Sequence, residues 1–227
     1  MANDMVERGT DAASTAQKGR LALMGAGHLG QLLAHHAIAA GWEVAGFFDD
    51  TLPIGHGTPL GPVLGGIGQA KESHTTGQYD AAIVAIGYKH FAFRQRLFDG
   101  LVADGVPMGT ILHPASFIDN SAKIGPGSVV LPGCTIDAHS SLGPNVLLNT
   151  GCIVAHDTSI ATHTFLGPGV ALAGFIQIGE RCFLGIGTIV IDGITMAADT
   201  QTGGGTVVTK NIEVPGLYVG SPARFVR

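Results

Sequence analysis

The most regular feature of the chain is a hydrophobic position that recurs every six residues from Ile118 to Val208. Fifteen of these sixteen positions carry an aliphatic side chain or Met, and only Thr202 departs from the pattern. A period of six fits neither an amphipathic helix (3.6) nor an ordinary strand (2). The position four residues further on is small or β-branched, as at Cys134 and Thr158. Two inward positions in each hexad predict a parallel β-helix with three short strands and three corners per coil of eighteen residues.

Two further features of the hexads lead to predictions. A glycine often follows the aliphatic residue, as at Gly143 and Gly167, and we expect it to permit the backbone conformation of a tight corner. All three cysteines, Cys134, Cys152 and Cys182, occupy the small inward position. We therefore interpret them as core residues.

The N-terminal half alternates short apolar runs with helical patterns, which indicates a parallel sheet covered on both faces. The expected strands and helices are Leu21–Met24, Gln31–Ala40, Val44–Phe48, Ala81–Ile86, Phe91–Ala103 and Gly109–Leu112. The Gly- and Pro-rich stretch from Thr51 to Gly68 has no period, and we expect a loop there that lines a pocket.

The fold class is thus an α/β, half-Rossmann-like N-terminal domain followed by a left-handed parallel β-helix of hexapeptide repeats. We divide the chain into a disordered arm (1–18), an α/β domain (19–112), the β-helix (113–214) and a C-terminal tail (215–227).

Composition narrows the functional classes. The net charge is −5 and the chain has no basic run, which argues against nucleic acid and anionic membrane partners. No apolar run reaches the roughly 18 residues of a membrane span, and the first eighteen residues lack the apolar core of a secretory signal. Three cysteines favour a reducing compartment, so we expect a cytoplasmic protein. No His, Cys or Asp spacing resembles a zinc site, so we expect no metal.

The first candidate site is the string Gly25 to Gly30, a G-x-G-x-x-G pattern that opens a helix. Its backbone N–H groups can meet phosphate. Because the domain has room for about one half of a dinucleotide fold, we expect a nucleotide-sized pocket, with a dinucleotide or a purely structural turn as alternatives. The residues expected to bind this ligand follow strand ends: Gly25, Gly27, His28, Asp49, Asp50, Gly87, Tyr88 and Lys89. Arg94 follows them and could meet a phosphate, although solvated surface charges would look the same.

The second candidate site is His156-Asp157, a dyad on a corner of a middle coil. Positions eighteen residues away are Ala138 and Gly174, so His156 should face an open floor. A carboxylate that fixes the imidazole and a free N–H of Gly174 that could meet an oxyanion suit acyl transfer. His139 could pair with Asp157 from one coil below.

The tail, Lys210 to Arg227, has a local net charge of +2, which suits an anionic ligand such as the phosphates of coenzyme A. Ordinary solubilising charge is the alternative.

From about Arg20 onward the chain resembles the bacterial NeuD/PglD-type sugar O-/N-acetyltransferases. The resemblance rests on Phe48-Asp49-Asp50, Ala85-Ile86-Gly87, Leu148-Asn149-Thr150, Val154-Ala155-His156-Asp157, Ala173-Gly174, Phe183-Leu184-Gly185-Ile186, Gly203-Gly204-Gly205 and Val219-Gly220-Ser221-Pro222-Ala223.

The resemblance implies a homotrimer that uses acetyl-CoA and has its active sites between adjacent β-helices. His156 would be the general base, oriented by Asp157, and Asn149 would contact the substrate. At acetyl-CoA the resemblance implies contacts from Gly174, Ile186 and Gly204, and it puts Phe165 at a position that often touches the coenzyme. The charge of the tail adds Lys210 and Arg224. Three residues depart from the family: Leu29 takes a usual histidine position, Asp157 replaces Glu, and Phe165 replaces a histidine.

The expected activity is acetyl transfer from acetyl-CoA to the amine of a UDP- or GDP-linked 4-amino-4,6-dideoxyhexose, for surface glycan biosynthesis. The alternatives are O-acetylation of sialic acid or another sugar, and a non-catalytic nucleotide-binding scaffold. The sequence leaves open the nucleotide, the sugar stereochemistry and the pathway.

Overall fold

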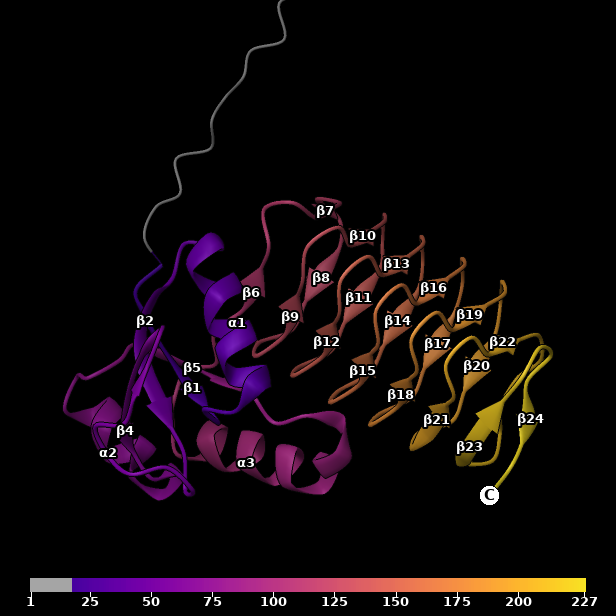
Figure 1. The fold of residues 1–227 in the computed structure, drawn as a ribbon. Coiled ribbons are helices and arrows are strands. Elements are labelled where there is room, and N and C mark those ends of the chain that lie inside the picture. Colours follow the sequence, from indigo (N-terminus) through magenta and orange to yellow (C-terminus); the bar gives the residue numbers. More distant parts are fainter. Residues whose placement is uncertain (1–17) are drawn as a thin grey trace, which may run out of the picture.

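The computed structural model describes residues 18–227, so the predicted arm lies outside the described residues except for Lys18. An α/β domain is followed by a long parallel β-helix, which confirms the predicted fold class (Figure 1).

The α/β domain is built on a five-stranded sheet. Its elements are β1 (Arg20–Met24), α1 (His28–Ala39), β2 (Glu43–Phe48), β3 (Gly57–Thr58), β4 (Gly61–Gly65), α2 (Ala70–Thr75), β5 (Ala81–Val84) and α3 (Phe91–Ala103), with 3-10 turns at Ile67–Gln69 and Tyr88–His90. The strand order is β3-β4-β2-β1-β5, and all neighbours except β3 and β4 run parallel. The order reverses between β1 and β5, and ligands of such sheets bind at the carboxyl ends of the strands at this point.

The stretch from Thr51 to Gly68 is not the irregular loop that its composition predicts. β3 and β4 form an antiparallel hairpin, and β4 extends the sheet beside β2. Val63 of β4 is buried in the core. A Cβ on Gly46 would lie 2.5 Å from the carbonyl oxygen of Pro62, so glycine lets these strands approach.

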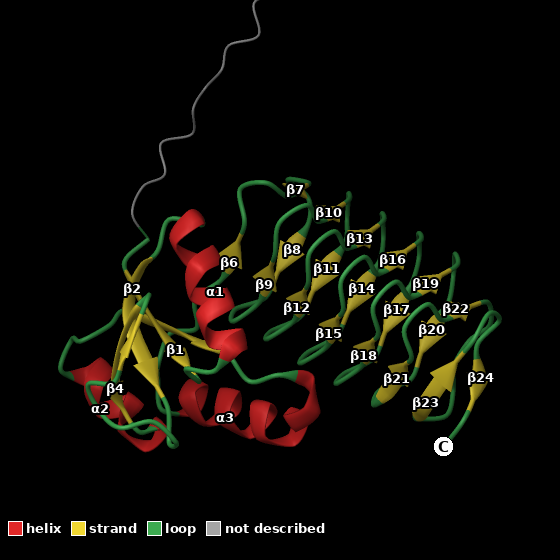
Figure 2. Ribbon diagram, in the orientation of Figure 1, coloured by secondary structure: helices red, strands yellow, loops and turns green. Residues whose placement is uncertain are grey.

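The β-helix consists of short strands that stack into three flat faces (Figures 1 and 2). We name each face by its outward side chains, which are apolar on the first face, polar on the second, and covered by the α/β domain on the third. The apolar face comprises β7 (Phe117–Ile118), β10 (Thr135–Ile136), β13 (Ile153–Val154), β16 (Ala171–Leu172), β19 (Ile189–Val190) and β22 (Val207–Val208). The polar face comprises β8 (Lys123–Ile124), β11 (Ser141–Leu142), β14 (Ser159–Ile160), β17 (Gln177–Ile178) and β20 (Thr195–Met196). The covered face comprises β6 (Ile111–Leu112), β9 (Val129–Val130), β12 (Leu147–Leu148), β15 (Phe165–Leu166), β18 (Phe183–Leu184), β21 (Thr200–Thr202), β23 (Gly216–Val219) and β24 (Arg224–Phe225).

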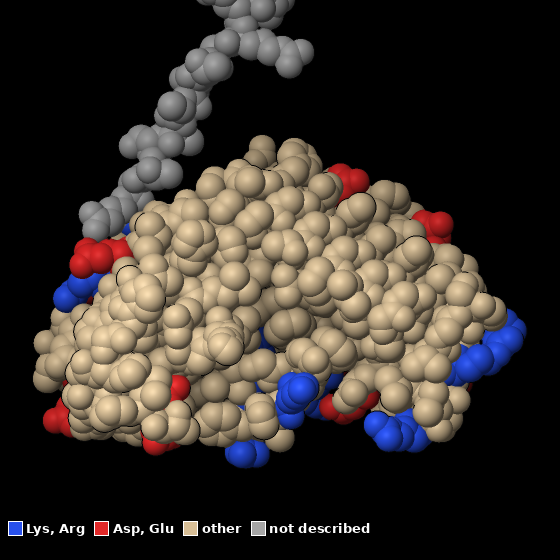
Figure 3. All heavy atoms as spheres, in the orientation of Figure 1, with Lys and Arg blue, Asp and Glu red and all other residues tan. Residues whose placement is uncertain are grey.

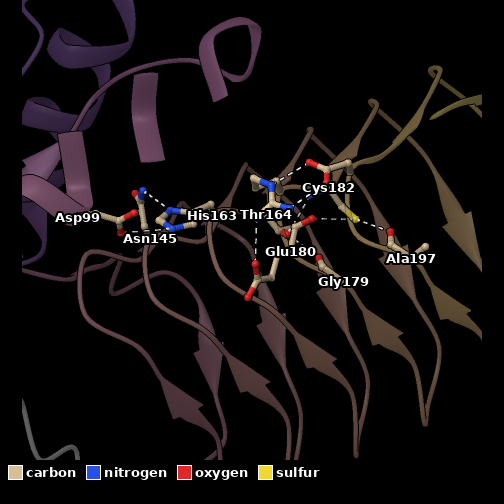
Figure 4. Close-up of polar contacts among 10 residues, drawn as sticks. Asp99, Asn145, His163, Thr164, Gly179, Glu180, Cys182 and Ala197 are labelled. Carbon is tan, nitrogen blue, oxygen red and sulfur yellow. Dashed lines mark hydrogen bonds and ion pairs between the residues drawn. The ribbon is translucent and has the colours of Figure 1, made fainter. Parts of the chain in front are cut away.

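The inside of the coils matches the hexad pattern. The aliphatic positions from Val130 onward are buried, and the small positions fill the space between them. Their polar groups are satisfied by the next coil: the Thr164 hydroxyl donates to the Gly179 carbonyl at 3.0 Å, and the Cys182 thiol donates to Ala197 at 3.3 Å (Figure 4). All three cysteines are free and buried, as expected of core residues.

The glycines that follow the aliphatic positions have a different role from the predicted one. Gly143 and Gly167 do not adopt a left-handed conformation; a Cβ on either would lie 2.9 or 2.8 Å from a backbone nitrogen of the next coil. They permit close stacking. The left-handed residues come two positions later, for example Asn145 (φ 55) and Gly169 (φ 65).

The α/β domain packs on the covered face. Leu33 and Ile83 share a hydrophobic cluster with Leu131, Leu147 and Phe165 of the β-helix. β6 pairs with β9 of the β-helix, whereas we expected Gly109–Leu112 to complete the α/β sheet; only Met108 makes a bridge to that sheet, at Ala82.

A buried polar network joins α3 to the β-helix. Arg94, predicted to meet a phosphate, is fully buried and donates to the Asn145 carbonyl at 2.7 Å. Burial lowers the pKa of Arg94 to about 9. The Asn145 amide lies 3.0 Å from His163, whose Nε2 is 3.7 Å from Asp99 (Figure 4). These contacts and the shared core fix the domain on one side of the coils.

Candidate active site

The His156-Asp157 dyad occupies a corner between the apolar and polar faces. It follows β13 and precedes β14. Asp157 has a left-handed backbone (φ 54), which Asp tolerates better than most residues. His156 Nδ1 lies 3.0 Å from Asp157 Oδ2. Because a carboxylate only accepts hydrogen bonds, Nδ1 carries the proton of the neutral ring and Nε2 keeps its lone pair. Both side chains are about half exposed, so Nε2 can accept a proton from a ligand.

Gly174 lies directly against the imidazole, as the eighteen-residue spacing predicts. A Cβ at this position would be 2.8 Å from Cε1 and 2.9 Å from Nε2 of His156. Any larger residue would displace the ring. The open floor that the sequence predicts therefore exists on this side of His156.

The N–H of Gly174 is not free, in contrast to the expectation. It donates to Asp192 Oδ1 at 3.1 Å. Asp192 occupies the same corner position one coil later, so the spacing that led from His156 to Gly174 would have found it. An acyl oxygen could use this N–H only after the Asp192 carboxylate moves away.

Phe175 is a second residue that sequence reasoning missed at this corner. Its ring centroid lies 5.1 Å from that of His156 in an edge-to-face arrangement. It stands eighteen residues after Asp157, so the same arithmetic would have placed it beside the dyad. His139 does not take the role considered for it, since the Asp157 carboxylate pairs with His156 of its own coil.

Three other predicted residues lie on the opposite edge of the apolar face. Asn149, Ile186 and Gly204 occupy corners between the covered and apolar faces, so one chain does not bring them to His156. Ile186 is exposed, and a Cβ on Gly204 would touch its Cγ2 at 3.0 Å. The Asn149 side chain accepts a hydrogen bond from the Thr150 N–H at 2.8 Å.

Phe165 and Tyr88 meet at the junction of the two domains. Tyr88 stacks on Phe183 with centroids 4.0 Å apart and contacts Phe165 edge-on at 5.6 Å. Phe165 is buried within the chain. This aromatic cluster joins the α/β domain to β15 and β18.

Lys210 and Arg224 line the same pocket, at the C-terminal end of the β-helix. Thr209, Asn211 and Tyr218 also line it, and its volume is about 190 Å³. Figure 3 shows basic side chains at this end of the molecule. Two cations in one small pocket suit an anionic group.

The predicted nucleotide residues gather at the carboxyl ends of β1, β2 and β5. Gly25 has a left-handed backbone (φ 113) that a side chain would strain, and a Cβ on Gly30 would lie 1.9 Å from the Gly25 carbonyl oxygen. Gly27 has nothing within 4 Å, and Gly27 and His28 are exposed at the start of α1. These glycines leave the helix N-terminus open to a ligand.

The two acids after β2 hold this loop in place. Asp49 accepts from the Ala26 N–H at 2.9 Å, and Asp50 accepts from the Ile67 N–H at 2.8 Å. Both carboxylates therefore have a structural role besides any contact with a ligand. Gly87 and the exposed Lys89 follow β5 at the same edge.

Comparison with known proteins places this geometry in a family. The profile of the PglD N-terminal domain matches residues 20–101, and that of the bacterial transferase hexapeptide matches residues 115–150. A solved variant of perosamine N-acetyltransferase from Caulobacter crescentus, in complex with CoA and GDP-perosamine, is 31% identical with a TM-score of 0.87, over 92% of this chain and 98% of that chain. The chain belongs to the NeuD/PglD-type family of sugar acetyltransferases.

Further structures agree with this membership. The acetyltransferase domain of PglB from Neisseria gonorrhoeae, in complex with acetyl coenzyme A, is 29% identical with a TM-score of 0.84, over 91% of this chain and 98% of that chain. WeeI from Acinetobacter baumannii, at 23% identity and a TM-score of 0.76, shares the fold. Comparison with curated proteins gives no match.

Two classes of feature are missing from residues 18–227 of this NeuD/PglD-type chain. Within that range, no three His, Cys, Asp or Glu side chains are grouped so that they could hold a metal ion. None of the helices in the same range has the length and hydropathy to span a membrane.

Proposed function

We propose that this chain transfers the acetyl group of acetyl-CoA to the amine of a nucleotide-linked 4-amino-4,6-dideoxyhexose, in the biosynthesis of a surface glycan. The observation that carries the proposal is the imidazole of His156, fixed through Nδ1 by Asp157 and lying close against Gly174. It stands in a fold that spans nearly all of a perosamine N-acetyltransferase crystallised with CoA and GDP-perosamine.

His156 acts as the general base. Nε2 takes the proton as the amine nitrogen attacks the thioester carbonyl, and a tetrahedral intermediate forms. As the intermediate collapses, the carbon–sulfur bond breaks and the same imidazole returns the proton to the coenzyme A thiolate. The Gly174 N–H stabilises the oxyanion once Asp192 has released it.

Direct attack is supported by the cysteines. Cys134, Cys152 and Cys182 point into the coils and are at most 1% exposed. Burial raises the pKa of Cys182 to about 12, which disfavours its nucleophilic thiolate. A buried thiol cannot form an acyl-enzyme with a bulky thioester. The Lys210 and Arg224 pocket, at one end of the β-helix, offers a place for a phosphate of coenzyme A.

The placement of the α/β domain supports a site shared between copies. The domain packs on the covered face, whereas His156 lies at the corner between the other two faces. A sugar nucleotide held at the ends of β1, β2 and β5 would therefore be presented to the His156 of a neighbouring copy. Asn149, Ile186 and Gly204 lie on the edge of the apolar face beside the covered face, and a cyclic assembly would bring that edge to the dyad of the next copy.

The apolar face provides the contact for such an assembly. Its outward residues include Phe117, Ile153 and Ile189, exposed to 58%, 48% and 46%. The polar face carries Lys, Ser, Gln and Thr at the equivalent positions. Because no part of the described chain covers these side chains, the apolar face can bury them only against another molecule, and we propose a homotrimer built on this face.

A thiol-release assay tests the function. Acetyl-CoA is offered with UDP-, GDP- and dTDP-linked 4-amino sugars and with free sialic acid. We expect turnover of one nucleotide-linked amino sugar, with a loss of about 10²–10⁴-fold in kcat for His156→Ala. Turnover of sialic acid alone would instead support O-acetylation, and near wild-type kcat in His156→Ala would reject the base.

A further inference from the structure

Phe175 is attached to the catalytic corner through both its backbone and its side chain. Its N–H donates to the His156 carbonyl at 3.2 Å, and its ring meets the imidazole edge-to-face at 5.1 Å. The ring is 62% exposed. Phe175 therefore forms a wall beside the imidazole that solvent, or a ligand, can touch.

The backbone of Phe175 is costly for this residue type. Its φ of 58° lies in the left-handed region. The other non-glycine residues of the described chain in that region are polar: His139, Asn145, Asp157, His163, Arg181 and Asp199. Gly193 occupies the same position in the next coil. A bulky apolar residue in this conformation is strained, and its exposed ring gains little from burial in the fold. The exposed ring is therefore available for a contact outside the chain.

The chemistry of the reaction indicates what that contact is. The amine nitrogen must come within about 3 Å of Nε2. In a 4-amino-4,6-dideoxyhexose the reacting amine is flanked by a methyl group on one side and a hydroxyl on the other. Groups on the neighbouring ring carbons move with the amine, so one flank of the sugar meets the wall beside the imidazole. An aromatic wall favours the methyl group, because a hydroxyl there would lose its hydrogen bonds to water.

We propose that Phe175 is a specificity-determining residue that contacts the methyl group next to the reacting amine and so selects 6-deoxy amino sugars over their 6-hydroxy counterparts. This inference rests on the proposed function. A hydrophobic surface rejects an added hydroxyl by up to about 10²-fold, so we expect a preference of about 10–100-fold in kcat/KM for the 6-deoxy sugar.

The test compares the wild type, Phe175→Asn and Phe175→Leu on the two nucleotide-linked 4-amino sugars that differ only at C6. Asn suits the left-handed backbone, so its variant should fold at least as well as the wild type. We expect the preference to fall below about 3-fold in the Asn variant and to be largely retained in the Leu variant, which keeps an apolar side chain.

Three results separate the possible failures. An equal loss on both sugars would overturn the proposal, since the ring would then act only on the position of His156. Dissociation of the assembly in light scattering, in step with the loss of activity, would also overturn it, because the ring would then be an interface residue. If the wild type acetylates neither sugar, the proposed function itself fails, and the role of Phe175 fails with it.

Discussion

The contact between Gly174 and His156 makes a sharp prediction for Gly174→Ala. The added methyl carbon would lie 2.8 Å from Cε1 and 2.9 Å from Nε2 of the imidazole. Ordinary contact between carbon atoms is about 3.5 Å, so the ring must retreat by about 0.7 Å or rotate. The backbone itself tolerates the change, because Gly174 has no left-handed φ and Ala138 occupies the same corner position two coils earlier.

Gly174→Ala should lower kcat and leave the stability of the fold nearly unchanged. A misplacement of about 1 Å in a catalytic group can cost about 10²-fold, so we expect kcat to fall by about 30–100-fold, or about 2–3 kcal/mol in activation free energy. The melting temperature should stay close to that of the wild type, because the exposed imidazole can move into solvent. Thiol release under saturating substrates measures kcat, and circular dichroism follows unfolding.

Gly100→Ala is the matched control for this variant. Gly100 lies in α3 with no atom within 4 Å of an added Cβ, so the same chemical change there should leave kcat unaltered. A Gly174→Ala enzyme with wild-type kcat would refute the argument that the floor of the corner positions the base.

Three further predictions concern other parts of the molecule. Asp192→Ala should raise kcat/KM for acetyl-CoA by about two- to fivefold, since the Gly174 N–H no longer has to leave a carboxylate; a decrease would show that Asp192 assists the reaction. Ile189→Asp should dissociate the proposed homotrimer in light scattering, whereas Ser159→Asp on the polar face should not; equal behaviour of the two would place the interface elsewhere. Burial, the largest cause, lowers the pKa of His163 from 6.5, so the unfolded state binds more protons and this histidine lowers stability as the pH falls below about 6.5. The melting temperature should therefore drop less between about pH 7.5 and 5.5 in His163→Asn than in the wild type, and an equal drop would contradict this assignment.

The β-helix could be predicted because every coil requires the same kinds of residue at the same positions. Residues such as Leu148 and Leu166 must fill the same inward position at each turn, so the period appears directly in the sequence. The same spacing located Gly174 against His156. The same spacing leads from Gly174 to Asp192 and from Asp157 to Phe175, so both residues of this corner lie within reach of the periodic pattern.

Other features depend on contacts that have no local signal. Glycine and proline in the β3–β4 hairpin give its sequence the appearance of a loop, and the place of the hairpin beside β2 depends on Gly46. The strand β6, which begins at Ile111, resembles any other short apolar strand in sequence. Its pairing with β9 is decided by the docking of the two domains. Arg94 resembles a surface cation in sequence, but that docking buries it against Asn145. A sequence pattern therefore predicts which residues are buried where burial is periodic, and predicts poorly which residues are buried between two domains.

The activity proposed for this chain is acetyl transfer to nitrogen on a nucleotide-linked sugar. The most direct measurement is the nuclear magnetic resonance spectrum of the product formed by the wild-type enzyme from acetyl-CoA and a GDP- or UDP-linked 4-amino-4,6-dideoxyhexose. We expect an acetamido group at C4, formed by the wild type and about 10²–10⁴-fold more slowly by His156→Ala. An acetyl ester on a hydroxyl, or acetyl-CoA recovered intact in the presence of every such sugar, would contradict it.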